Sequence, residues 1–126
     1  MLAKRILIID DEPDIREVAQ VSLETVSGWQ VLTAESGDEG ITKAKQEKPD
    51  AILLDAMMPI MDGPETFQKL RADPSTKQIP VIMFTAKVQP ADRKRFADFG
   101  AKDVIAKPFD PMKLGSQIAA ILGWSV

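Results

Sequence analysis

The sequence predicts an α/β fold built on a parallel sheet of five strands, and two observations lead to that prediction. Short apolar runs, bounded by turn residues, alternate along the chain with longer segments whose apolar residues recur at helical spacing. The runs are continuously apolar, which is typical of strands covered on both faces. Regular alternation of strands and helices produces a parallel sheet with helices on both sides, because each connection crosses back over the sheet.

The first strand and helix are predicted within residues 6–28. Residues 6–9 read Ile-Leu-Ile-Ile, a mostly β-branched run that is typical of a buried strand. The run stops at an acidic triplet, and Pro13 suits the first turn of a helix. Gly28 is the expected end of that helix, which carries apolar residues three and four apart.

The second strand and helix are predicted within residues 29–48. Residues 29–34 alternate enough in polarity to predict a short strand near the edge of the sheet. Ser36 and Glu39 have the spacing of a capping box, which predicts a helix that continues to about residue 48.

The central strand, residues 51–55, runs into a carboxylate. Four apolar residues lead directly to Asp55, and a loop rich in Met, Pro and Gly follows. The end of a buried strand is where open α/β sheets place ligands, although an aspartate there also caps turns. Pro64 then begins a helix that is expected to end near Asp73.

The last two strands are predicted at residues 79–84 and 103–106. The helix between them is expected to begin at Pro90 and to end at Gly100. Asp110-Pro111 has the form of an N-cap followed by a first-turn proline, which predicts a final helix from there to residue 122.

Five strand–helix pairs with this spacing favour the flavodoxin-like, doubly wound (βα)5 fold with strand order 2-1-3-4-5. The switch point of that order lies between the first and third strands. We therefore expect Asp10, Asp11 and Asp55 to meet in one crevice, with Thr85 and Lys107 beside it at the ends of strands four and five.

Composition excludes several classes of function. The 126 residues are sufficient for one domain, and a net charge of −3 without a basic cluster gives no support for nucleic-acid binding. The absence of cysteine and histidine excludes thiol chemistry and argues against soft metals. No apolar run approaches membrane-spanning length, and the apolar start ends too early for a signal peptide. We expect a cytoplasmic protein that binds no membrane.

The expected cluster of three carboxylates favours a hard cation. Two unit charges about 4 Å apart repel by roughly 4 kcal/mol at an effective dielectric near 20. Mg²⁺ offsets such repulsion and prefers oxygen ligands. With Lys107 as a second cation and the Thr85 hydroxyl as a donor, the site suits a phosphoryl group, and Asp55 is the candidate nucleophile for an aspartyl-phosphate.

Each of these residues also has an ordinary structural explanation. Asp10 and Asp11 precede a helix, where carboxylates cap the helix and favour its dipole. Thr85 alone suits a turn, Lys107 alone suits a solvated surface, and the methionines of the loop suit gap filling. The joint occurrence at predicted strand ends is what indicates a site.

The chain resembles a bacterial two-component response-regulator receiver domain over essentially its whole length. Four motifs in order carry the resemblance, at 8–13 (IIDDEP), 55–63 (DAMMPIMDG), 79–86 (IPVIMFTA) and 100–109 (GAKD to KPF). It is most similar to the stand-alone, chemotaxis-regulator type. We therefore expect a single domain over residues 1–126, without an output domain.

The resemblance implies a function for the site. Asp55 is expected to take a phosphoryl group from a histidine kinase or a histidine phosphotransfer protein, with Thr85 and Lys107 contacting its oxygens. Mg²⁺ is expected on Asp11, Asp55 and the backbone carbonyl of Met57, with Asp10 helping. The Lys107–Pro108 bond is expected to be cis. The resemblance also implies a downstream protein partner, which it does not name, and a protein that is expected to catalyse only its own phosphorylation and dephosphorylation.

One position departs from the family pattern. Three residues before the lysine, the family usually has Tyr or Phe, whereas this chain has Val104 and no tyrosine. The change that a partner detects is therefore expected to come from shifts of helix four, strand five and helix five.

The alternative function is a degenerate receiver that acts as a phosphorylation-independent scaffold. A phosphatase with an aspartate nucleophile is a further alternative, but such enzymes usually have a second aspartate where this chain has Met57. Met57 and Lys87 are expected to affect the lifetime of the phosphoryl group.

Overall fold

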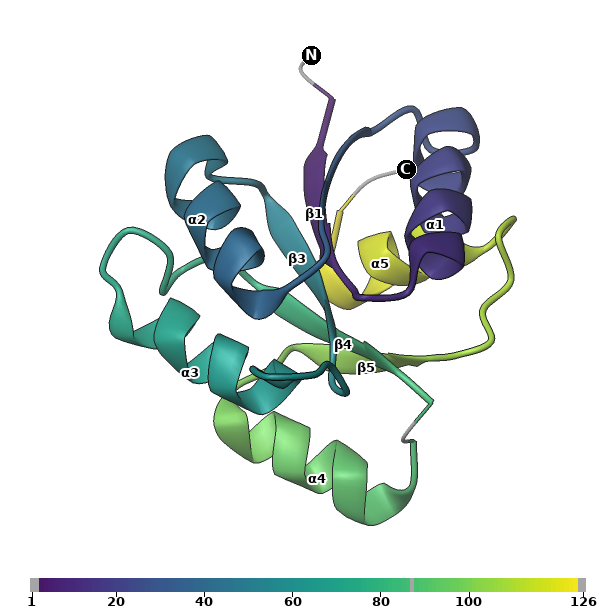
Figure 1. Cartoon of the computed structure of the whole chain (residues 1–126). Coiled ribbons are helices and arrows are strands. Elements are labelled where there is room, and N and C mark those ends of the chain that lie inside the picture. Colours follow the sequence, from purple (N-terminus) through teal and green to yellow (C-terminus); the bar gives the residue numbers. More distant parts are fainter. Residues whose placement is uncertain (1–2, 87, 125–126) are drawn as a thin grey trace.

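A computed structural model describes residues 3–86 and 88–124 of the chain. Five parallel strands lie in the order β2-β1-β3-β4-β5, so the predicted flavodoxin-like topology is confirmed (Figure 1). The strands are β1 (Arg5–Ile9), β2 (Gln30–Ala34), β3 (Ala51–Asp55), β4 (Val81–Thr85) and β5 (Asp103–Ala106). The helices are α1 (Pro13–Thr25), α2 (Gly37–Glu47), α3 (Gly63–Ala72), α4 (Pro90–Phe99) and α5 (Leu114–Leu122).

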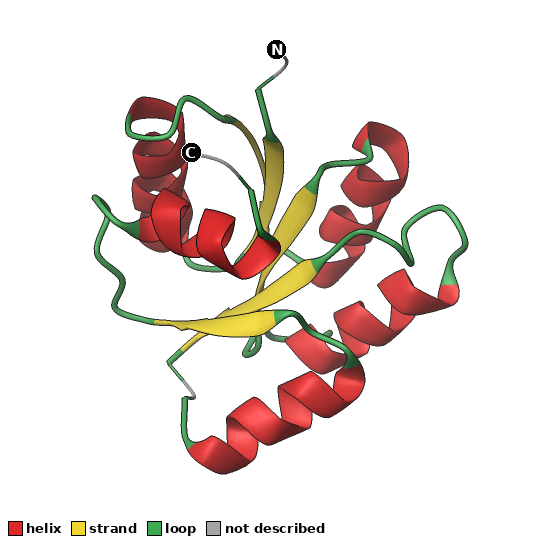
Figure 2. Ribbon diagram, turned by 180° about the vertical axis from the view of Figure 1, so that it is seen from behind, coloured by secondary structure: helices red, strands yellow, loops and turns green. Residues whose placement is uncertain are grey.

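The helices form two layers around the sheet. Helices α1 and α5 cover one face, and α2, α3 and α4 cover the other (Figures 1 and 2). Within β1, Ile6 and Ile8 pack toward α1 and α5, whereas Leu7 and Ile9 pack in the core beneath the other three helices. The continuous apolar run of this strand is thus explained, because successive side chains enter two separate cores.

The helix starts follow local chemistry. The Ser36 hydroxyl accepts from the Glu39 backbone N–H at 3.1 Å, as the capping box predicts. The Glu39 carboxylate in turn accepts from the backbone N–H of Glu35, one residue earlier than a capping box requires. Asp62 caps α3 in the same way, through the backbone N–H of Glu65 at 2.9 Å.

The predicted start of the final helix was wrong. Asp110 caps a separate turn, in which its side chain accepts from the Met112 backbone N–H at 2.9 Å, and α5 begins only at Leu114. The backbone carbonyl of Asp110 accepts from both Lys113 and Leu114, which connects this turn to the helix. A proline at position 111 suits a turn as well as a helix, so the sequence pattern did not distinguish the two.

Several other boundaries differ by one to three residues. Strand β4 begins at Val81 rather than at 79, because the backbone N–H of Ile79 donates to Thr76 in a turn. Helix α1 ends at Thr25, and the backbone N–H of Trp29 donates to the Leu23 carbonyl at the end of that helix instead of joining β2.

Among the described residues, no helix is long and apolar enough to cross a membrane.

Candidate functional site

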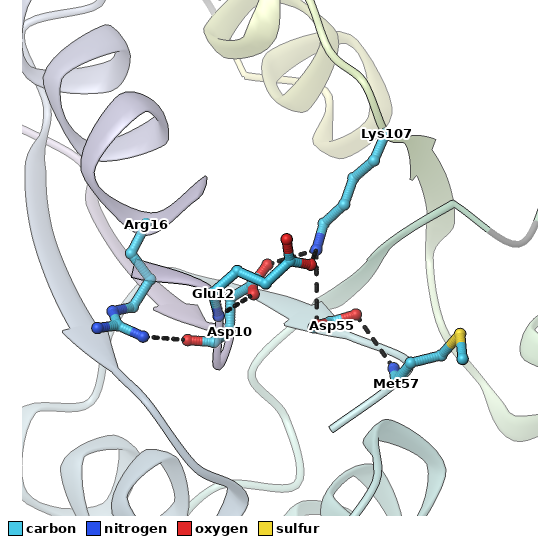
Figure 3. Close-up of polar contacts among 6 residues, drawn as sticks. All are labelled: Asp10, Glu12, Arg16, Asp55, Met57 and Lys107. Carbon is cyan, nitrogen blue, oxygen red and sulfur yellow. Dashed lines mark hydrogen bonds and ion pairs between the residues drawn. The ribbon is translucent and has the colours of Figure 1, made fainter. Parts of the chain in front are cut away.

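The carboxyl ends of β1 and β3 bring two buried carboxylates to one rim of the sheet (Figure 3). Asp10 follows β1 and is fully buried, whereas Asp55 ends β3 and is 3% exposed. Asp11 is half-buried and Glu12 is exposed next to them. The strand order therefore places the acidic residues together, as expected from the sequence.

Lys107, which follows β5, contacts three of these four acidic residues. Its Nζ lies 2.6 Å from Asp10 Oδ2, 3.5 Å from Asp55 Oδ2 and 3.4 Å from Glu12 Oε1. The same nitrogen lies 5.0 Å from the centre of the Phe84 ring, which is a favourable place for a cation. The Lys107–Pro108 peptide bond is cis, as expected.

Backbone N–H groups fix the orientation of the two buried carboxylates. Asp10 Oδ1 accepts from the backbone N–H of Glu12 at 2.9 Å, and Asp55 Oδ1 accepts from that of Met57 at 3.1 Å. In both residues the other oxygen, Oδ2, is the one that faces Lys107. Arg16 holds the segment from the other side, because its guanidinium donates to the Asp10 carbonyl at 2.7 Å.

The loop of residues 56–62, called the acceptor loop here after the role expected of Asp55, is folded back tightly against the end of β3. The backbone N–H of Gly63 donates to the Ala56 carbonyl at 3.1 Å. A Cβ atom on Gly63 would lie 2.4 Å from the Asp55 carbonyl oxygen and 2.6 Å from the Ala56 Cα, so only glycine allows this approach. The loop turns through Ile60, whose φ is 69°. Of its methionines, Met58 and Met61 are buried, whereas Met57 is exposed.

Burial dominates the electrostatics of Asp55. It raises the pKa of that carboxyl to about 7, with contributions in the same direction from the nearby Asp10 charge and a hydrogen bond to Asp11. The Met57 N–H and Lys107 oppose this effect. Burial would lower the pKa of Lys107, but its hydrogen bond to Asp10 and the surrounding carboxylates raise the pKa above 10.5. The positive charge of Lys107 thus does not compensate for the burial of Asp55 and for the carboxylates beside it.

The acidic group fits a hard divalent cation. Asp10, Asp11, Glu12 and Asp55 each offer a carboxylate oxygen, and these oxygens lie within 4.8 Å of one another. All the donors are oxygen atoms, which suits Mg²⁺ and not a soft metal. The elevated pKa of Asp55 points the same way, because an added cation would favour its ionised form.

Thr85 lies beside Lys107 at the ends of two paired strands. Thr85 is buried and pairs in register with Ala106, and its carbonyl accepts from the Lys107 backbone N–H at 3.0 Å. The five residues singled out in the sequence therefore end at one rim. Lys87, expected to affect the phosphoryl lifetime, lies outside the described residues.

Two residues of the site were not predicted from the sequence. Glu12 joins the acidic group and contacts Lys107, and Arg16 fixes the carbonyl of Asp10. Glu12 was adjacent to the acidic pair and was available as a signal. Arg16 lies one helical turn into α1, and its role depends on a side-chain direction that sequence spacing does not determine.

The sequence profile described as the response regulator receiver domain matches residues 6–119. Among curated proteins, the chain is 41% identical over 119 residues to the alkaline phosphatase synthesis transcriptional regulatory protein PhoP of Bacillus subtilis. That match covers 94% of this chain and 48% of PhoP. The chain therefore spans about half the length of such relatives.

Solved structures have the same fold, at lower sequence identity than PhoP. The chemotaxis protein CheY4 of Vibrio cholerae superposes with a TM-score of 0.88 at 29% identity, covering 94% of this chain and 98% of that one. The receiver domain of a sensor histidine kinase from Pseudomonas aeruginosa superposes with a TM-score of 0.84 at 28% identity, covering 96% and 98%. That structure contains a magnesium ion coordinated in its active-site cleft.

Proposed function

The chain belongs to the response regulator receiver domain family, and on that premise we propose that it is a phospho-accepting switch whose acceptor is Asp55. Receiver domains are signalling switches of two-component systems rather than ordinary enzymes. The observation that best supports Asp55 is its place at a buried strand end, within a group of carboxylates that Lys107 contacts. The donor would be the phosphohistidine of a histidine kinase or a histidine phosphotransfer protein.

The residues of the rim suit the chemistry of phosphoryl transfer. An ionised Asp55 oxygen attacks phosphorus and forms an O–P bond, while the P–N bond to the donor imidazole breaks and the ring nitrogen keeps the electron pair. Asp11, Asp55 and the Met57 carbonyl, helped by Asp10, would hold Mg²⁺. When bound, Mg²⁺ supplies positive charge that favours the ionised nucleophile and the phosphoryl oxygens.

Lys107 and Thr85 would bind the transferred group. Lys107 already lies 3.5 Å from Asp55 Oδ2, so a short movement of its flexible side chain brings it to a phosphoryl oxygen. The Thr85 hydroxyl, on the adjacent strand, would donate to another oxygen. Movement of these two side chains, at the ends of β4 and β5, biases the surface formed by α4, β5 and α5, where a protein partner binds.

Val104 favours a second candidate, a scaffold whose binding does not depend on phosphorylation. Val104 lies within β5, is 8% exposed and packs in the core with Phe96 of α4. A valine side chain has one stiff torsion and cannot exchange between buried and exposed positions as a ring can. Equal affinity for the partner with and without the phosphoryl group would support the scaffold and contradict the switch.

Incubation with Mg²⁺ and a phosphodonor tests the proposal. The unmodified chain should gain one phosphoryl group by mass spectrometry, and hydroxylamine should remove it because the product is an acyl phosphate. Asp55→Asn should gain none, whereas Asp98→Asn, a change to an exposed carboxylate of α4, should gain one as before. No gain by the unmodified chain from a kinase or from small donors would overturn the proposal. Turnover of small phosphate esters would instead favour a phosphatase.

A further inference from the structure

Arg16, in the first turn of α1, connects the segments that follow β1 and β2 at the rim of the sheet. Its side chain is only 18% exposed, and its Nη1 donates to the Asp10 carbonyl at 2.7 Å. Its Nη2 lies 3.8 Å from Oε2 of Glu35, which follows β2. Figure 3 shows Arg16 on the side of Asp10 that faces away from Lys107, so Arg16 contacts the backbone of Asp10 and Lys107 contacts its carboxylate.

The bond from Arg16 restrains the peptide unit between Asp10 and Asp11. The carbonyl of Asp10 and the N–H of Asp11 belong to one planar group, so an anchor on the carbonyl also limits the direction in which Asp11 leaves the strand. The rest of Asp10 is held as well, because its backbone N–H donates to the Ala34 carbonyl at 3.0 Å and its Oδ1 accepts from the Glu12 N–H at 2.9 Å. Arg16 adds the restraint on the peptide plane itself.

Asp11 depends on this restraint more than the two buried carboxylates do. Asp10 and Asp55 each accept a hydrogen bond from a backbone N–H, at 2.9 and 3.1 Å. Within residues 3–86 and 88–124, no backbone N–H donates to the carboxylate of Asp11. The hydrogen bond between Asp11 and Asp55 needs a proton between two carboxylates, so it cannot persist when both bind a cation. The direction of the Asp11 side chain then follows from its backbone.

We propose that Arg16 is a positioning residue for the magnesium site, because it holds the peptide between Asp10 and Asp11 in the plane that directs the Asp11 carboxylate toward Asp55. The inference rests on the proposed function, in which Asp11 and Asp55 hold Mg²⁺. Arg16 acts through the backbone of Asp10 and does not touch the ion. Partners that orient metal ligands in this way typically change the affinity for the metal by about 10- to 100-fold when they are removed.

The charge of Arg16 gives the proposal a sign that can be measured. A guanidinium next to a cation site repels the cation, so loss of the charge alone would strengthen Mg²⁺ binding. Loss of the positioning contact would weaken it, because Mg²⁺ requires its ligands in near-octahedral geometry. Arg16→Met removes the charge and the donors together and keeps an unbranched stem. Weaker binding by this variant therefore reports the contact and not the charge.

Isothermal titration calorimetry with MgCl₂ at pH 8 and low ionic strength measures the Kd of each variant. Arg16→Met should raise Kd about tenfold relative to the unmodified chain. Arg16→Lys, which keeps the charge and one donor group, should raise it about threefold. Glu35→Gln removes only the ion pair at 3.8 Å, and Arg93→Met removes an equal charge from an exposed position on α4. Both controls should stay within about twofold of the unmodified chain.

The dependence of phosphorylation on Mg²⁺ concentration provides a second readout. With acetyl phosphate as the donor, the Mg²⁺ concentration at half-maximal rate should rise about tenfold in Arg16→Met, and this rise should exceed any fall in the maximal rate. A merely structural role would lower the stability and the maximal rate without changing Kd. Denaturant unfolding in EDTA shows whether Arg16→Met is folded. If it is not, Arg16→Lys takes its place, and an unchanged Kd in that variant would overturn the inference.

The remaining outcomes separate this inference from the proposed function. Mg²⁺ binding by folded Arg16→Met that equals or exceeds that of the unmodified chain would overturn the inference. The same weakening in Glu35→Gln or Arg93→Met would also overturn it, as would a fall in maximal rate without a change in Kd. Each of these results leaves the proposed function intact when the unmodified chain gains its phosphoryl group. An unmodified chain that neither binds Mg²⁺ nor gains a phosphoryl group would overturn both.

Discussion

Asp55 makes the stability of the protein depend on pH in an unusual direction. Most carboxylates are stabilised in their ionised form by folding, but burial raises the pKa of Asp55 from 3.8 to about 7. Between these values the folded protein keeps a proton that the unfolded chain releases. The stability from this group is complete below pH 3.8 and is lost as the pH rises through about 7.

Replacing Asp55 should therefore stabilise the metal-free protein at alkaline pH. Asp55→Asn removes the buried charge, and at pH 8 it should increase the free energy of unfolding by at most about 4 kcal/mol, the equivalent of that pKa change. Denaturant unfolding from pH 5 to pH 8 in EDTA gives the measurement. A parallel pH dependence in Asp55→Asn and the unmodified chain would show that Asp55 is ionised throughout, and Asp98→Asn serves as the exposed control.

At this scale the sequence predicted which residues meet but not how they pair. The expectation that Asp10 and Lys107 lie at one rim followed from strand ends alone. It did not follow that the two carboxylates would direct Oδ2 toward one lysine, or that Glu12 would join them, because rotamers depend on neighbours from three separate strands and loops.

At the level of elements, the start of α3 depends on the lack of a side chain at Gly63. Its backbone is not in the left-handed region, so alanine would be favourable for the helix itself. Its Cβ would nevertheless lie 2.4 Å from the Asp55 carbonyl oxygen, an atom of the backbone that cannot move without shifting β3. The cost is therefore steric and falls directly on Asp55, the proposed acceptor.

Gly63→Ala should destabilise the fold by about 2 kcal/mol or more and should also slow phosphorylation of Asp55. Gly123→Ala is the matched control, since Gly123 has a φ of 72° and nothing within 4 Å of an added Cβ. That control should cost about 1 kcal/mol through backbone strain alone and leave phosphorylation unchanged. Thermal unfolding and phosphorylation rates measured together separate the two effects; equal losses of stability would contradict the steric account.

The cap of α2 gives a smaller and more local prediction. Ser36→Ala removes the hydroxyl that accepts from the Glu39 N–H and should cost about 1 kcal/mol. Ser36→Asp restores an acceptor at a helix start and should recover most of that loss. Chemical denaturation of the three proteins measures it, and a loss in Ser36→Asp as large as in Ser36→Ala would show that capping is not the cause.

The elements themselves were largely predictable, and their ends were not. Ser36 and Pro13 predicted helix starts because each acts within its own short stretch of chain: the Ser36 hydroxyl accepts from a backbone N–H three residues later, and the Pro13 ring fixes its own φ. The start of α5 was misplaced since Asp110-Pro111 satisfies a turn and a helix equally well. The choice between them depends on tertiary packing, including the contact in which the Ser22 hydroxyl of α1 donates to the Pro111 carbonyl.

For the molecule as a whole, the clustered carboxylates of Asp10, Asp11, Glu12 and Asp55 repel one another, and a bound cation would reduce this repulsion. Mg²⁺ that binds the folded state alone adds RT ln(1 + [L]/Kd) to the stability, so the midpoint of thermal unfolding should rise with its concentration. Asp11→Asn should reduce this rise strongly. Asp14→Asn, a change in the first turn of α1 outside the acidic group, should not. Calorimetry with Mg²⁺ and after EDTA checks both, and equal responses of the two variants would contradict the assignment.

The topology was predictable because few arrangements remain once five strand–helix pairs are connected in the right-handed sense. The pocket of about 500 Å³ that Arg95 of α4 lines together with residues of the acceptor loop was not predictable. Its existence depends on how far α4 lies from that loop, and the ion pairs of the neighbouring Arg93 and Lys94 depend on which carboxylates come near them. Both are properties of the assembled molecule that no local pattern contains.

The contact between Lys4 and Trp124 marks a part of the molecule where it can be immobilised or labelled without blocking the site. The Lys4 ammonium lies 4.7 Å from the Trp124 ring centre, and that ring meets Trp29 edge-on at 5.4 Å. Lys4 precedes β1 and Trp29 precedes β2, so this contact lies at the amino ends of the parallel strands, whereas Asp10 follows the other end of β1. A sensor chip or fluorescent protein coupled near either position would thus lie at the end of the sheet opposite Asp55 and leave access to Asp55 open.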